Sequence, residues 1–164
     1  MGSSDGSVAA ILEALAALEV RVVATGGPAV DLSALRLPAN AVVREALSHR
    51  ALMPDVALCV THGGHGTITE ALRCGVPMVC LPNPLSDQAY LASRVSALGA
   101  ALSVDQQASP DEIRAAVEHV LSKPGYREAA ARLKAKIGEG GAGRAADLLE
   151  TLIPVTVGAE HMRS

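Results

Sequence analysis

Two short segments, residues 56–60 and 77–81, are apolar at every position. A strand of this composition needs burial on both faces, whereas a strand of a half-exposed sheet alternates apolar and polar side chains. Amphipathic helical patterns at residues 66–74 and 87–98 follow the two segments, and a further strand is predicted at 100–104. Strands that alternate with helices in this way favour a parallel sheet with right-handed crossovers and helices on both faces. The predicted fold class is therefore α/β, with a doubly wound, Rossmann-like parallel sheet.

The segments on either side of this core continue the alternation. Ser7 can cap a first helix, whose apolar residues recur at helical spacing up to Leu18. The other predicted elements are a strand at 20–24, a short strand near Val42, a helical turn at 49–53, and helices at 111–121, 125–137 and 144–153, the last of them after a glycine-rich break at 138–143.

The composition argues against several classes of function. The 14 Lys and Arg against 17 Asp and Glu leave a net charge of −3, so we expect no basic surface for nucleic acid. With no Trp, no Phe and two Tyr, the chain also has few aromatic side chains on which bases stack. Its longest stretch without Asp, Glu, Lys or Arg is 56–69, which is shorter than the roughly 20 residues of a membrane-spanning helix. We therefore expect no membrane insertion.

The cysteines indicate a reducing compartment. Cys59, Cys74 and Cys80 are odd in number and show no C-x-x-C spacing. Two of them lie in predicted buried strands, which favours reduced thiols in the core. The first residues form no basic and apolar leader, so we expect a cytoplasmic protein.

Ligands of parallel α/β sheets bind beyond the carboxyl ends of the strands. Four loops at such ends have an unusual composition, namely 25–27, 45–49, 62–67 and 83–88. The third reads His-Gly-Gly-His-Gly-Thr and runs directly into a predicted helix. Its glycines let backbone N–H groups approach an anion, the helix N-terminus adds about half a positive charge, and His62 supplies a further donor. We interpret this loop as a phosphate site.

Other interpretations of this loop stay open. Thr67 and Glu70 have the spacing of a capping box, which would only start the helix, and both functions can coexist. A zinc pair of His62 and His65 is a weaker hypothesis, because no third ligand stands at zinc-site spacing. The chain has no G-x-S-x-G nucleophile elbow, no G-x-x-x-x-G-K-[ST] phosphate loop and no complete dinucleotide fingerprint.

A longer segment carries a known donor-site signature. Residues 62–79 read HGGHGTITEALRCGVPMV and are followed by Pro82 and by Asp87-Gln88. From about residue 7 to residue 153, the chain resembles the carboxyl-terminal domain of GT-B-fold nucleotide-sugar glycosyltransferases of the UDP-glucosyl, UDP-glucuronosyl and macrolide type. The resemblance implies one half of a GT-B fold, with 7–153 as a nucleotide-sugar-binding domain. Residues 1–6 can be a remnant of cloning, and residues 154–164 form a tail.

The resemblance implies transfer of a sugar from a UDP- or dTDP-sugar to a small lipophilic acceptor, such as a natural product in antibiotic glycosylation. It implies no metal and no cofactor besides this donor, and the sequence contains no D-x-D motif. The family's amino-terminal domain, which binds the acceptor and carries the general base, is absent here, as is one central strand. We therefore expect the chain alone to be incomplete for catalysis. The alternative is a non-catalytic nucleotide-sugar-binding module, or a subunit completed by a separate acceptor-binding partner.

The resemblance also implies residue roles. His62 would stabilise the diphosphate of the leaving group, which is the one catalytic role in this chain. Glu70 would accept hydrogen bonds from the ribose hydroxyls, and Asp87 and Gln88 would hold the sugar, although Asp87 is also a good helix N-cap. The remaining predicted contacts to the nucleotide sugar are Thr25, Leu47, His49, Gly64, His65, Gly66 and Thr67.

Some of these roles have structural alternatives. Thr25 can simply turn the chain, and His49 is as readily a structural residue. His119 and His161 are interpreted as solvated or packed residues without a role in the site. The aromatic residue that the family places against the base has no counterpart near Ala46, which leaves the base preference open.

Overall fold

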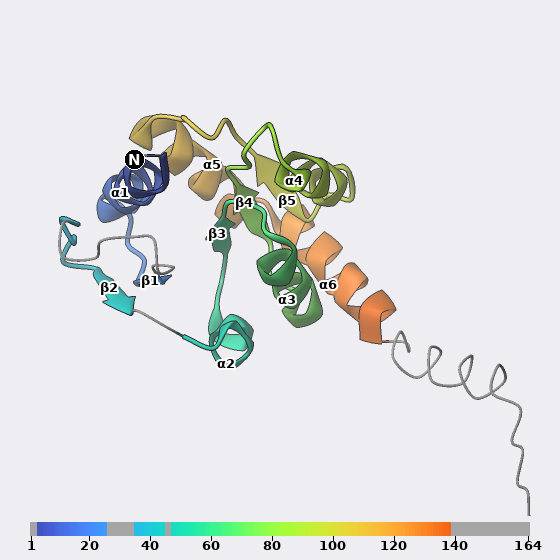
Figure 1. Ribbon diagram of the computed structural model, residues 1–164. Coiled ribbons are helices and arrows are strands. Elements are labelled where there is room, and N and C mark those ends of the chain that lie inside the picture. Colours follow the sequence, from blue (N-terminus) through green and yellow to red (C-terminus); the bar gives the residue numbers. More distant parts are fainter. Residues whose placement is uncertain (1–2, 26–34, 45–46, 139–164) are drawn as a thin grey trace, which may run out of the picture.

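In the computed structural model (Figure 1), the described residues are 3–25, 35–44 and 47–138. They form helices and strands in alternation, which confirms the predicted α/β class. The elements are α1 (Ser3–Ala16), β1 (Val22–Thr25), β2 (Ala41–Arg44), α2 (His49–Leu52), the 3₁₀ helix η2 (Met53–Asp55), β3 (Cys59–Thr61), α3 (His65–Cys74), β4 (Met78–Cys80), α4 (Asp87–Ala97), β5 (Ala101–Ser103), α5 (Pro110–Ser122) and α6 (Pro124–Gly138).

The described strands pair in parallel throughout. They form two ladders, β1-β2 and β3-β4-β5. The parallel arrangement is confirmed, but the predicted single sheet is divided, because no pairing joins β1 to β3 among the described residues. The two ladders meet through packing instead, since Val22 of β1 and Val60 of β3 both contact the apolar cluster that α1 and α5 form with β4.

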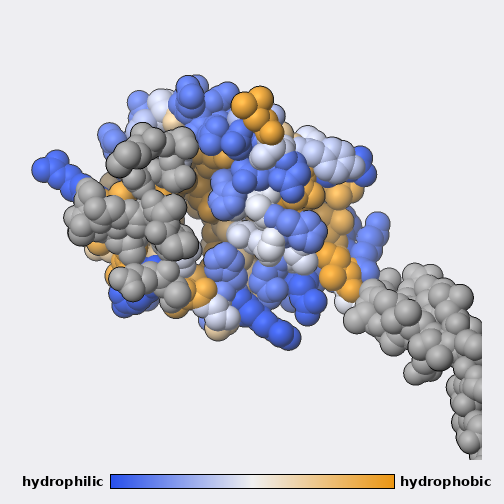
Figure 2. All heavy atoms as spheres, viewed as in Figure 1, coloured by the Kyte–Doolittle hydropathy of each residue, from blue (hydrophilic) through white to orange (hydrophobic). Residues whose placement is uncertain are grey.

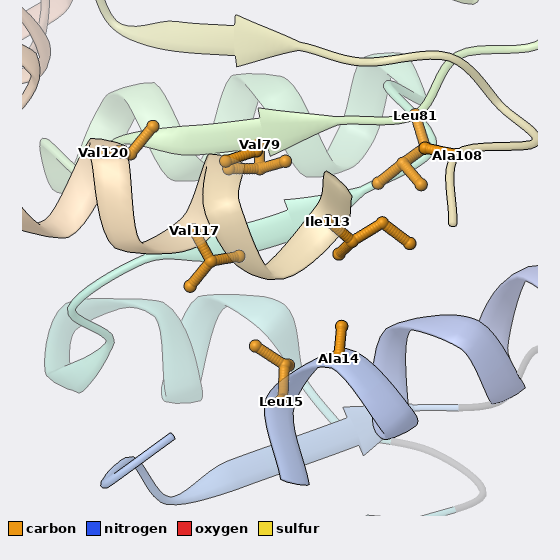
Figure 3. Packing of buried hydrophobic residues seen from close by; sticks show 9 residues of the cluster. Ala14, Leu15, Val79, Leu81, Ala108, Ile113, Val117 and Val120 are labelled. Atoms are coloured by element: carbon orange, nitrogen blue, oxygen red, sulfur yellow. The ribbon is translucent and has the colours of Figure 1, made fainter. Parts of the chain in front are cut away.

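One face of the three-stranded ladder is covered by α1 and α5. Val79 of β4 and Leu81 just beyond it pack with Leu15 of α1 and with Ile113 and Val117 of α5. These side chains lie between the elements that carry them and point toward one another in Figure 3. Their burial removes apolar area of all three elements from water, which stabilises the layered arrangement.

The opposite face is covered by α3 and α4. Met78 and Cys80, the alternate residues of β4, pack with Ile68 of α3 and Val95 of α4. Each of the three residues of β4 is 0% exposed, so this strand is buried on both faces, as its composition predicts. Figure 1 shows α1 and α5 on one side of the ladder and α3 and α4 on the other, which confirms the doubly wound arrangement.

Some predicted boundaries differ from the structure. α1 begins at Ser3, so Ser7 lies within the helix and is not its cap. The strand predicted at 56–60 is found at Cys59–Thr61, because Val56 is the C-cap of η2, with its N–H donating to the carbonyl of Met53 at 3.2 Å, and pairing with β4 begins only at Cys59. The helix predicted at 144–153 and the glycine-rich break before it lie outside the described residues.

The cysteines are free thiols, as predicted. Burial raises the pKa of the Cys59 thiol to about 11. Burial, together with the nearby charge of a Cys59 thiolate, raises the pKa of Cys80 to about 12. Both thiols therefore stay protonated at neutral pH and are weak nucleophiles.

One face of the protein is mostly polar (Figure 2). Figure 2 shows hydrophilic residues over much of the face in view, with hydrophobic atoms visible between them. In the described part of the chain, no helix has the length and apolar character that crossing a membrane requires.

Candidate functional site

Two loops meet at the carboxyl end of the three-stranded ladder. One leads from β3 to α3 and the other from β4 to α4, and because the two strands are parallel neighbours, both loops emerge at the same edge. Gly63 in the first loop lies against Gln88 in the second, since a Cβ atom at position 63 would stand 3.4 Å from the Gln88 carbonyl oxygen. The structure therefore brings the predicted phosphate loop into contact with one of the two predicted sugar-binding residues.

Gly63 needs to be glycine for this approach. Its φ is +88°, a conformation that side chains with a Cβ rarely adopt. Its N–H donates to Oγ1 of Thr61 at 3.1 Å, and Thr61 is itself buried at the end of β3. The strand end thus fixes the start of the loop.

The imidazole of His62 lies over Gly64. Its Nε2 atom is 2.7 Å from the point where a Cβ of residue 64 would stand, so only a glycine leaves room for the ring in this position. His62 is exposed and does not turn into the core. Because Gly64 is the residue that precedes α3, the ring lies at the positive end of that helix.

The first turn of α3 has unpaired N–H groups. Gly64 is the N-cap and makes no side-chain cap bond, and the first described bond of this turn runs from the N–H of Ile68 to the Gly64 carbonyl at 3.0 Å. The N–H groups of His65, Gly66 and Thr67 have no acceptor among the described residues. These are the orphan donors that bind anions at helix N-termini.

The predicted capping box of Thr67 and Glu70 is wrong. α3 begins at His65, so Thr67 lies inside the first turn and cannot act as its N-cap. The Glu70 carboxylate instead lies 3.9 Å from Nε of Arg73, one turn along the same helix. An ion pair of this length on a half-exposed helix contributes little, which leaves the carboxylate available to other partners.

The second loop positions Asp87 and Gln88. The N-cap of α4 is Ser86, whose Oγ accepts the N–H of Gln88 at 3.3 Å, so the alternative that Asp87 caps the helix is wrong. Asp87 is the exposed first residue of α4. Oε1 of Gln88 accepts the N–H of Asn83 at 3.1 Å. Asn83 and Ser86 were missed by the sequence reasoning, although Asn and Ser ahead of Asp-Gln are typical of a turn followed by a capped helix.

Three further predicted residues lie before β3. Thr25 is the exposed last residue of β1, opposite Arg44 of β2, and Leu47 is exposed ahead of α2. His49 is the half-buried first residue of α2, a helix that packs against α3. No described hydrogen bond links these three to the two loops, and residues 26–27 and 45–46, which belong to two of the loops of unusual composition, lie outside the described residues.

A surface hollow of about 510 Å³ lies elsewhere, between β5 and α5. Leu102, Ala116 and His119 are among its lining residues, and none of the predicted site residues is. His119 is exposed and makes an edge-to-face ring contact with Tyr126, with 5.8 Å between the ring centres. Because the hollow contains none of the predicted site residues and the two loops bring several of them together, we place the candidate site at the two loops.

The chain also matches a family of known proteins. The family model described as erythromycin biosynthesis protein CIII-like, C-terminal domain, matches residues 9–153. The chain belongs to this family. The predicted resemblance to the carboxyl-terminal domain of GT-B glycosyltransferases is thereby confirmed, and it extends to relatives in natural-product biosynthesis.

The similar proteins are glycosyltransferases of greater length. The chain is 40% identical over 124 residues to 4'-demethylrebeccamycin synthase of Lentzea aerocolonigenes, an alignment that covers 75% of this chain and 29% of the relative. The glycotransferase of kitacinnamycin has a TM-score of 0.81 at 37% identity, covering 90% of this chain and 39% of that one. The glycosyltransferase VinC in complex with dTDP has a TM-score of 0.76 at 29% identity, covering 88% and 37%. The chain thus spans about a third of the length of these relatives.

Proposed function

We propose that this domain is the donor-binding half of a metal-independent glycosyltransferase. The donor is a UDP- or dTDP-sugar, and the acceptor is a small lipophilic molecule such as a natural product. The general base and the acceptor-binding surface are supplied by a domain or partner outside this chain. Membership of the family and the dTDP complex of one similar structure support this proposal.

One observation carries the proposal. The exposed His62 imidazole lies at the start of α3, where the helix dipole is positive, together with the N–H groups of His65, Gly66 and Thr67, which have no acceptor in the described ranges of the chain. This arrangement suits a diphosphate, which carries several acceptor oxygens and negative charge. Donors aimed at a diphosphate also stabilise the charge that grows on it as the sugar departs, which is the form of catalysis that the proposal requires.

The remaining residues complete the donor site in the proposal. Glu70 accepts hydrogen bonds from the ribose hydroxyls, and its carboxylate is available for them because its contact with Arg73, the one ion pair it makes among the described residues, is long. Asp87 and Gln88 bind the sugar, since Gln88 packs directly against the phosphate loop at Gly63. The three residues before β3, Thr25, Leu47 and His49, are assigned to the nucleotide end of the donor.

The decisive experiment is calorimetric titration of the protein with UDP, dTDP and GDP, repeated on His62→Ala. We expect UDP or dTDP to bind the parent, and His62→Ala to bind it about tenfold to a hundredfold more weakly, as expected for loss of a hydrogen bond to a charged group. His119→Ala is the matched control, because His119 is an exposed histidine outside the site. Equal affinities of parent and His62→Ala would show that the diphosphate lies elsewhere.

A further inference from the structure

The net charge of −3 conceals an uneven distribution of charge along the chain. Residues 123–136 hold five of the 14 Lys and Arg but only one of the 17 Asp and Glu. This acid is Glu128, and the next one in the sequence is Glu139, beyond the last residue of α6. The cations are exposed throughout, namely Lys123, Arg127, Arg132, Lys134 and Lys136. α6, with the lysine just before it, is therefore a basic helix in an otherwise acidic chain.

The helix turns its apolar side to the rest of the protein. The residues at the spacing of one helix face are buried or half-buried, namely Tyr126, Ala129, Ala130 and Leu133. α6 lies beside α3 in Figure 1 and packs against it. The opposite face consists of exposed residues that are mostly small, and we define these as the outer strip: Glu128, Ala131, Ala135 and Gly138.

Cations flank the outer strip on both sides. At about 3.6 residues per turn, Arg132 and Lys136 lie along one flank, and Arg127 and Lys134 lie along the other. The second pair is held against the protein. Nη2 of Arg127 donates to the carbonyl of residue 57 at 2.9 Å, and Cδ of Lys134 is 3.3 Å from the would-be Cβ of residue 75. In the described ranges, none of these four cations forms an ion pair, so the protein does not neutralise their charge.

Helix stability accounts for one of these cations. A cation in the last turn of a helix interacts favourably with the helix dipole, and this effect falls off within that turn. Lys136 is the basic residue in the last turn of α6. Arg127 and Arg132 lie further from this end, so the helix dipole does not explain them.

We propose that α6 docks on an anionic lipid surface, to which the protein adsorbs without inserting. Long cationic side chains on both flanks can reach lipid phosphates whose positions are not fixed. The outer strip has no large aromatic anchor of the kind that carries binding between proteins. Its alanines and glycine bury little apolar area, so adsorption is electrostatic. Adsorption does not require the proposed function, although a lipophilic acceptor of the kind proposed would partition into the same surface.

The test is sedimentation of the full chain with lipid vesicles. One set of vesicles contains phosphatidylglycerol and phosphatidylcholine in equal parts, and the other contains phosphatidylcholine alone. The variant Arg132→Gln with Lys136→Gln removes the two cations of one flank. The matched control, Arg36→Gln with Arg50→Gln, removes two exposed cations outside α6 and has the same net charge. Circular dichroism checks that both variants are folded.

We expect the parent to sediment with the anionic vesicles at about 0.05 M salt and to be released at about 0.5 M, because salt screens exposed charges. Phosphatidylcholine alone should not bind it. The α6 variant should bind roughly tenfold more weakly or less, because each cation near an anionic surface contributes about fivefold in affinity. The control variant should stay within about twofold of the parent, since charges further than a Debye length from the surface are screened.

Two single substitutions sharpen the test. Arg132→Lys keeps the charge and should keep the affinity, whereas loss of binding would indicate a site that recognises the guanidinium group and not a lipid surface. Ala135→Lys adds a cation to the outer strip and should tighten binding about fivefold. Unchanged binding in Ala135→Lys would show that the outer strip does not face the lipid.

Three further results overturn the proposal. If the parent does not sediment with anionic vesicles at low salt, α6 is a solvated helix or meets an acidic protein. If the α6 variant and the control lose affinity equally, net charge and not α6 drives adsorption. If a short double-stranded DNA at the same phosphate concentration binds as tightly as the vesicles, α6 does not select lipid. The proposed function is independent of all these results, because it depends on the two loops at the strand ends.

Discussion

At the scale of single residues, two adjacent glycines shape the candidate site for different reasons. Gly63 adopts a positive φ and lets the first loop rest on Gln88. Gly64 has ordinary dihedral angles, and its hydrogen atom leaves room for the imidazole of His62. A third glycine, Gly66, has nothing within 4 Å of its would-be Cβ, so its role is limited to leaving the first turn of α3 open.

We predict that Gly63→Ala lowers the free energy of unfolding by about 1–2 kcal/mol, the usual cost of a left-handed conformation in a residue with a Cβ. It should also weaken nucleotide-sugar binding, because the loop must move off Gln88. Urea denaturation and titration with the donor measure the two effects. Gly66→Ala is the control for the unfolding measurement and should be neutral or stabilising there, since alanine favours a helix and meets no protein neighbour at this position. Equal losses in both variants would contradict the assignment.

At the scale of elements, α3 and α5 begin in opposite ways. α5 starts with a complete capping box, in which Ser109 and Glu112 satisfy each other's backbone N–H groups. α3 starts with a glycine and no side-chain cap. A helix whose first turn is capped by its own side chains has fewer free donors for a ligand. The difference is consistent with a structural start for α5 and a binding role for the start of α3.

We predict that Ser109→Ala lowers the free energy of unfolding by about 1 kcal/mol at pH 7, as loss of an N-cap usually does. The loss should shrink in acid. The backbone N–H and the hydroxyl of Ser109 both donate to the Glu112 carboxylate and lower its pKa, and Ser109→Ala removes the hydroxyl bond alone. The stabilising effect of that bond is present above the ordinary glutamate pKa and disappears as the pH falls and the carboxylate is protonated. Urea denaturation at pH 7 and pH 3 tests this, with Ser122→Ala at the other end of α5 as control. A loss that is independent of pH would contradict it.

At the scale of the whole molecule, helices cover both faces of β4, the central strand of the three-stranded ladder. Each face of β4 packs into a separate cluster of buried apolar side chains, one shared with α1 and α5 and the other with α3 and α4. Cys80 lies in the second cluster, and Cys59 packs against it from β3. Access to these two thiols therefore reports on opening of the core.

We predict that a thiol reagent at pH 8 modifies Cys74 in the folded protein and modifies Cys59 and Cys80 only after unfolding. The pKa values of about 11 and about 12 keep Cys59 and Cys80 protonated, and Cys80 is in addition fully buried. Mass spectrometry of the labelled protein identifies the sites, and labelling in urea provides the reference for full reaction. Equal rates at all three cysteines in the folded state would show that the ladder opens readily.

Local pattern was enough to predict the fold class and the candidate loops. Residues 77–81 are apolar throughout, and the structure buries β4 completely, because a strand covered on both faces has no position for a polar side chain. The glycines and histidines at 62–67 also predicted an open strand-to-helix turn, since few residues other than glycine permit that backbone. The capping residues were predicted less well than the helices, at Ser7, Thr67 and Asp87, because several polar residues near each start can cap it and neighbouring contacts decide which one does.

The sequence by itself determined the alternation of elements, the burial of the central strand and the family to which the chain belongs. The tertiary structure alone decided that Gly63 rests on Gln88, that His62 lies over Gly64, and that the Gln88 oxygen is engaged by Asn83. The physical reason is the separation along the sequence of the residues that determine each feature. The apolar composition and periodicity of a segment are set by residues close together in the sequence, whereas the contact of Gly63 with Gln88 depends on where two separate loops lie in space. The position of the His62 ring over Gly64 depends on how the first loop folds. The orientation of the Gln88 amide depends in turn on how the second loop folds back on the start of α4.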